Sequence, residues 1–87
     1  MSETKKRVRP ATSIPIDPAK LRLVLRRRFI TNREASELLG KSSEWMAVVL
    51  NKRRINFYML DDLAGALNMN FSDLFEEIVD EEQWLAL

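Results

Sequence analysis

Apolar residues recur every three or four positions in five segments of this chain, and polar residues separate them. That spacing places each apolar set on one side of an α-helix. The five sets are Leu21, Val24, Leu25 and Phe29 (or the alkyl stem of Arg28); Ala35, Leu38 and Leu39; Met46, Val49 and Leu50; Leu60, Leu63, Ala64 and Leu67; and Phe71, Leu74, Phe75 and Ile78. The pattern predicts five short amphipathic helices around one core.

Residues that cap helices stand at the matching positions. Ser, Thr, Asp and Asn side chains accept hydrogen bonds from the free N–H groups of a first helical turn, and Gly or Asn often ends a helix. The expected N-caps are Asp17 (before Pro18), Thr31 (a capping box with Glu34), Ser42, Asn56 and Asn70 (a box with Asp73), and the expected end points are Gly40 and Asn68. The caps and the apolar sets therefore predict the same five helices.

The composition excludes several classes of function. The 87 residues contain two glycines, three prolines, no cysteine and no histidine. Disulfides, thiolate or imidazole metal sites and histidine acid–base catalysis are absent, and we expect no enzyme, metal or cofactor. No apolar run has membrane-spanning length and no signal peptide is visible, so a cytoplasmic protein is expected.

Charge divides the chain into unlike parts. The formal net charge is +1, but nine of the basic residues precede residue 31 and none follows Arg54, while eight acidic residues lie from Asp61 onward. Such asymmetry favours a polyanionic partner for the basic part. Residues 1–16, basic and broken by Pro10 and Pro15, are predicted to be a disordered arm, residues 17–79 a domain, and residues 80–87 an acidic and apolar tail.

Two of the predicted helices meet at Gly40, and the basic triplet Lys52–Arg54 follows the second. Two short helices joined by a tight turn with glycine are typical of the helix-turn-helix motif, whose second helix enters the major groove of DNA. Residues 43–51 are the expected recognition helix. Cations beside it would contact phosphates, which supply much of the affinity for DNA.

Three segments of the chain resemble the Cro and phage-repressor helix-turn-helix family, also called the XRE family: Thr31–Glu34, Glu37–Ser42 and Leu63–Phe75. The resemblance covers roughly residues 17–79. It implies an all-α, five-helix, lambda-repressor-like domain with a flexible basic N-terminal arm, and a transcriptional repressor of phage or mobile-element origin that binds double-stranded DNA.

Positions carried over from that family give the expected DNA contacts. Base contacts are expected at Ser43, Glu44, Ala47 and Val48, phosphate contacts at Asn32, Asn51, Lys52, Arg53 and Arg54, and contacts from the arm at Lys5, Lys6, Arg7 and Arg9. Lys41 stands where the family often has an apolar residue, and a phosphate contact is expected there because this cation lies beside the recognition helix. Ala47 and Val48 cannot form the bidentate hydrogen bonds that discriminate bases best. They are suited to thymine methyl groups or to a protein partner.

The apolar end of the acidic tail is interpreted as an interface. A homodimer is expected, because two copies on neighbouring half-sites give tighter binding than one. Its predicted contacts are Phe75, Ile78, Trp84, Leu85 and Leu87, with folding back onto the core as the alternative use of Trp84. Trp45 is expected to pack on the first helix or to stack on DNA or a partner.

Two other functions stay open at this point. One is an antitoxin or adaptor that uses the same fold to bind a protein such as a toxin or an antirepressor. The other is an architectural or excision-type DNA-binding protein, which would differ from a repressor in bending the duplex rather than in the residues used.

Overall fold

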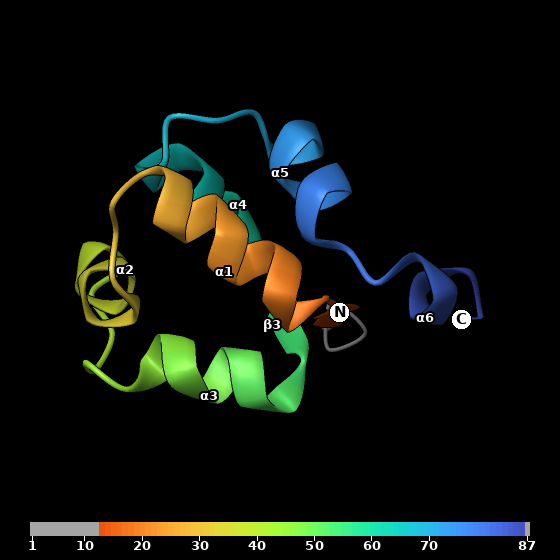
Figure 1. The fold of residues 1–87 in the computed structure, drawn as a ribbon, viewed down its shortest axis with the longest axis horizontal. Coiled ribbons are helices and arrows are strands. Elements are labelled where there is room, and N and C mark those ends of the chain that lie inside the picture. The colour runs from red at the N-terminus through yellow and green to blue at the C-terminus, as the bar shows by residue number, and fades with distance from the viewer. Residues whose placement is uncertain (1–12, 87) are drawn as a thin grey trace, which may run out of the picture.

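The computed structural model describes residues 13–86, which form six helices and two short strands (Figure 1). In chain order the elements are β2 (Ser13–Pro15), α1 (Pro18–Arg27), α2 (Asn32–Leu38), α3 (Trp45–Lys52), β3 (Arg54–Asn56), α4 (Phe57–Ala66), α5 (Phe71–Ile78) and α6 (Glu81–Leu85). The described part is mostly helical, as the apolar spacing predicts. It is not all-α, however, and the expected number of five helices is wrong.

Four of the predicted caps are confirmed. The Asp17 carboxylate accepts from the N–H of Ala19 at 3.0 Å, and Asn56 accepts from the N–H groups that begin α4. Thr31 and Glu34 form the reciprocal capping box, with distances of 3.1 and 2.9 Å. Asn68 adopts the left-handed conformation, with φ of 59°. These local signals set where the helices begin and end.

Two predicted caps are wrong in detail. α3 begins at Trp45, and its N-cap position is Glu44, because the Ser42 carbonyl accepts from the N–H of Trp45 in a turn before the helix. The N-cap position of α5 is Asn70, but its side chain makes no cap bond and instead reaches the Asp73 carboxylate at 3.4 Å.

One core draws on every described element except α6. Its members include Ile16, Leu21, Met46, Leu60 and Leu74, all fully buried. Two residues predicted for the apolar stripes lie outside it. Phe29 follows the end of α1 with φ of 57° and is 92% exposed, and Leu38 is exposed on α2. Phe29 leaves the stripe because α1 ends at Arg27, whereas Leu38 is still helical but lies on the exposed side of α2.

The expectation of a disordered arm through residue 16 is wrong for its last four residues. Ser13–Pro15 pairs antiparallel with β3, with Ile14 opposite Ile55, and Ile16 bridges to Val79. Ile14 and Ile16 are both buried, and the N–H of Ile16 donates to the Arg53 carbonyl at 3.0 Å. The short apolar segment is thus a strand that ties the start of the domain to the residues after α3.

The predicted tail from residue 80 contains a helix of its own. The Asp80 carboxylate caps α6 by accepting from Gln83, and the Asp80 N–H donates to the Pro15 carbonyl at 3.0 Å. The start of α6 is thus hydrogen-bonded to β2. The residue after β2, Ile16, is in turn bonded to Arg53 at the end of α3, so one segment positions both helices. No helix among residues 13–86 is long and apolar enough to cross a bilayer.

Candidate nucleic-acid interface

The turn between α2 and α3 is built around one buried serine. Ser36 lies on α2 and is fully buried, and its hydroxyl donates to the Asn32 carbonyl and accepts from the N–H of Met46, both at 2.9 Å. Its own carbonyl accepts from Lys41 at 2.9 Å, just after Gly40 with φ of 69°. A left-handed residue with no Cβ lets the chain reverse there. The serine therefore fixes the angle between α2 and α3.

The outward side of α3 carries most of the predicted base contacts. Glu44, Ala47, Val48 and Asn51 are all exposed and, at three- and four-residue spacing, share one face of the helix. Met46, Val49 and Leu50 are buried on the opposite face. Ser43 is half-buried and its hydroxyl donates to the Glu44 carboxylate at 2.7 Å. The face is small and mostly apolar at its centre, where Val48 is 45% exposed.

The basic triplet lies at the C-terminal end of that face, and it does not wholly follow the helix, because its first residue is still part of α3. Lys52 is the last residue of α3, Arg53 ends the helix in the left-handed conformation, and Arg54 begins β3. All three are exposed. The Arg54 guanidinium donates to the hydroxyl and the carbonyl of Ser13, at 2.8 and 3.2 Å. Lys52 and Arg53 are thus the cations of the triplet left for an anionic ligand.

A hollow of about 470 Å³ opens beside the same end of α3. Its lining includes Trp45, Val48, Lys52, Arg54 and Ser13. Trp45 is half-buried and packs against the core. The sequence analysis does not predict Ser13 as part of this hollow, because its place depends on the pairing of β2 with β3, nor Met59, which reaches the hollow from α4.

The remaining predicted phosphate contacts, Asn32 and Lys41, lie at the start of α2 and in the turn before α3. Asn32 is the first residue of α2 and Lys41 lies in the turn, and both are exposed. Exposed polar residues thus stand at both ends of α3. The predicted arm contacts Lys5, Lys6, Arg7 and Arg9 lie outside the described residues. In sequence Arg9 is four positions from Ser13, a span of at most about 14 Å.

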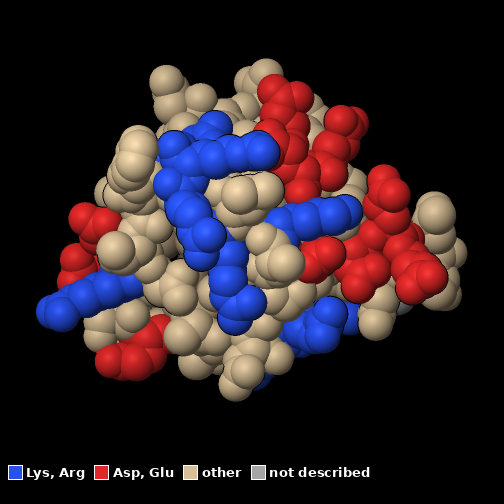
Figure 2. Space-filling view, viewed as in Figure 1, with Lys and Arg blue, Asp and Glu red and all other residues tan. Residues whose placement is uncertain are grey.

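Charges are segregated on the described surface. Figure 2 shows Lys and Arg side chains along α1 and Asp and Glu side chains over α5 and α6. The basic residues of α1 are Lys20, Arg22, Arg26 and Arg27. Between described residues the one ion pair joins Arg33 to Glu37 on α2, at 3.2 Å. On this face of the folded protein the basic side chains of α1 therefore adjoin the acidic side chains of α5 and α6.

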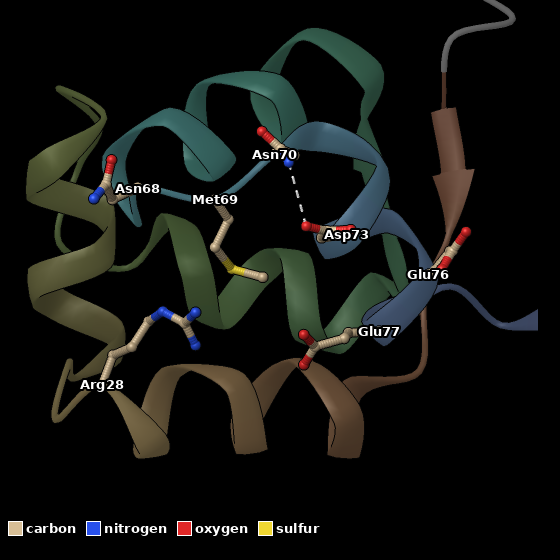
Figure 3. Close-up of a pocket in the computed structure, with 7 residues that line it drawn as sticks. All are labelled: Arg28, Asn68, Met69, Asn70, Asp73, Glu76 and Glu77. Carbon is tan, nitrogen blue, oxygen red and sulfur yellow. Dashed lines mark hydrogen bonds between the residues drawn. The ribbon is translucent and has the colours of Figure 1, made fainter.

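A second hollow, of about 630 Å³, lies between the end of α1 and α5. Figure 3 shows Arg28 and Glu77 on facing sides of it, with Met69 between them, while Asn70 reaches Asp73. This hollow is mostly lined by carboxylate and amide side chains and is remote from α3. It offers nothing to a polyanion.

The predicted dimer contacts are only partly on the surface. Ile78 is fully buried and cannot touch a second copy, because its side of α5 faces the core. Trp84 packs edge-on against Phe75 with a ring separation of 5.2 Å, which is the folded-back alternative, yet it stays 40% exposed. Leu85 is 83% exposed, and Leu87 lies outside the described residues.

No protein-family model, curated protein or solved structure matches this chain. The geometry of its own residues is therefore the basis for the function proposed below.

Proposed function

We propose that the chain is a sequence-specific, double-stranded-DNA-binding protein and a transcriptional regulator, with α2 and α3 as its helix-turn-helix. The exposed face of α3 would lie in the major groove. The observation that carries this proposal is the outward face around Val48, with Lys41 before the helix and Lys52 and Arg53 at its end. A groove floor offers base edges and its walls offer phosphates, and this order of side chains is complementary to both.

The apolar centre of the face limits how bases are read. Ala47 and Val48 would contact thymine methyl groups, and Glu44 is placed to accept from a cytosine amino group. The phosphate contacts would come from Asn32, Lys41, Lys52 and Arg53. The basic residues 5–9 would extend the contact, since the chain that carries them joins the domain at the hollow beside α3.

The acidic elements support the same orientation. Phosphates repel the carboxylates of α5 and α6, so those helices would face away from the duplex. A repressor of phage or mobile-element type is the form of regulator that the sequence resembles. Two copies on neighbouring half-sites are part of the proposal, because one small module buries a modest interface with DNA.

A titration across salt concentrations tests the proposal. The probes are a fluorescently labelled mixed-sequence duplex and the duplexes selected by the protein from a random pool. Binding should weaken steeply with salt, and Lys52→Ala or Arg53→Ala should each flatten the slope of log K against log salt by about 1. Arg28→Ala is the matched control, because it removes a cation from the hollow beside α5 and should leave the slope unchanged.

Failure has a clear form. If no duplex is bound at low salt, or if selection yields no preferred sequence, the proposed function is wrong. If Arg28→Ala flattens the slope as much as Lys52→Ala does, the cations beside α3 have no special role.

A further inference from the structure

Five aromatic rings form one continuous surface across α4, α5 and α6. The ring centres of Tyr58 and Phe57, Phe57 and Phe71, Phe71 and Phe75, and Phe75 and Trp84 are 5.5, 4.8, 6.0 and 5.2 Å apart. We name this set the aromatic stripe. Phe57, Tyr58 and Trp84 are each at least 40% exposed, and Phe71 and Phe75 are half-buried. An exposed apolar surface of connected rings is typical of an interface.

The helices that carry the stripe are acidic. The three helices that carry it hold no Lys or Arg. Their carboxylates and that of the α6 cap are Asp61, Asp62, Asp73, Glu76, Glu77, Asp80, Glu81 and Glu82. A twofold contact of stripe with stripe would bring these carboxylates of both copies together, which is unfavourable. The occupant of the stripe therefore has to be basic and apolar.

The chain itself carries a surface of that chemistry. Arg22, Leu23, Arg26 and Arg27 are exposed on α1, and Phe29 follows it with 92% of its surface open to solvent. Phe29 lines one hollow together with Arg22 and Arg26, so the ring stands among the guanidinium groups. We name these five residues the basic knob. A bulky residue with positive φ is strained, and here the strained residue has a ring that is almost wholly exposed.

We propose that the basic knob of one copy binds the aromatic stripe of a second copy. The Phe29 ring would pack against Phe75 and Trp84, and arginines of α1 would lie over aromatic faces and beside the carboxylates of α5 and α6. None of these charges forms an ion pair within the described part of the chain, where the one ion pair is on α2. The knob and the stripe are complementary in both charge and apolar character.

The turn that carries Phe29 and the helix that carries Trp84 lie at different ends of the molecule. In Figure 1 the turn after α1 is at the end occupied by α2, whereas α6 is at the opposite end of the long axis. A contact between unlike surfaces is heterologous, so it produces a ring of copies if the rotation between them closes and an open head-to-tail row if it does not. Successive copies would therefore add to one another. This inference does not use the DNA-binding function.

The test is sedimentation of the full chain without DNA, at rising protein concentration. Between about 10 mM and about 1 M salt the Debye length falls from about 30 Å to about 3 Å, so a charge-assisted contact should weaken strongly. We expect growth beyond a dimer at low salt and a monomer at high salt. Phe29→Asn and Trp84→Ala should each raise the dissociation constant at least about tenfold.

A mixture of the two variants gives the sharpest result. Phe29→Asn keeps an intact stripe and Trp84→Ala keeps an intact knob, so an equimolar mixture should form a one-to-one complex that grows no further. Leu38→Asn is the matched control. Leu38 is exposed but belongs to neither the knob nor the stripe, so this variant should behave like the parent chain. Circular dichroism of each variant tests whether it is folded.

Three results would overturn the proposal. The first is a monomer at every concentration at low salt. The second is a closed dimer that persists in Phe29→Asn, which would show that copies meet through other residues. The third is a mixture of folded variants that forms no complex. Loss of DNA binding in the separate titration leaves all of these readings unaffected.

Discussion

The Ser36 hydroxyl joins α2 to α3 by accepting a hydrogen bond of 2.9 Å from the backbone N–H of Met46. Both residues are fully buried, and the N–H at the start of α3 has this side chain as its partner. A buried N–H without a partner is costly. The angle at which α3 is held therefore depends on a single hydroxyl group.

Ser36→Ala should lower the free energy of unfolding by about 1–3 kcal/mol, because it leaves the Met46 N–H buried and unbonded. Ser43→Ala is the control, since the Ser43 hydroxyl bonds only to the exposed Glu44 carboxylate. Its effect should stay within about 0.5 kcal/mol. Urea unfolding of the three proteins measures both values, and equal losses would show that the buried bond is not important.

Phe29→Asn should stabilise the fold by about 1 kcal/mol. The residue has φ of 57°, a conformation that asparagine adopts more readily than phenylalanine, and the ring is 92% exposed. The substitution removes little buried apolar surface, because the phenylalanine ring is already exposed. Thermal unfolding at high salt, where copies separate, measures the change. A destabilised variant would mean that the ring has contacts within its own chain.

Ile16→Ala should lower the free energy of unfolding by about 2–5 kcal/mol, because a fully buried side chain leaves a cavity. Removal of residues 1–12 should change it by less than about 0.5 kcal/mol. Urea unfolding of the two variants distinguishes the contribution of Ile16 to stability from that of residues 1–12. If the truncation were as harmful as the substitution, the boundary at Ser13 would be misplaced.

Val48→Ala should relax the sequence preference at one position of the selected duplex. Removing two methyl groups from an apolar contact with a thymine methyl group costs about 1 kcal/mol, or roughly fivefold in affinity. Competition between the selected duplex and its thymine-to-uracil analogue measures the effect. Leu38→Ala is the control on α2 and should discriminate between the duplexes as the parent chain does.

The helices could be predicted from the sequence because their determinants are local. The capping box of Thr31 and Glu34 and the left-handed Asn68 depend on residues a few positions apart. The buried stripe of α4 follows in the same way from apolar spacing. These features specify where helices lie and which of their faces is buried.

The strands and α6 depend on partners that are distant in sequence. Ile14 pairs with Ile55 across 41 positions, and α6 begins where the Asp80 N–H reaches Pro15. Three-residue strands carry no readable period, so β2 resembled the end of a polar arm. The α3 face was predicted, but the hollow beside it was not, since Ser13 joins it only through this pairing.

Amide chemical shifts recorded while a selected duplex is added would test the role of α3 most directly. The DNA-binding proposal predicts large, saturable shifts for residues 41–54, with those of α5 and α6 almost unchanged. Shifts concentrated in α5 and α6, or none in residues 41–54 at saturating duplex, would contradict it.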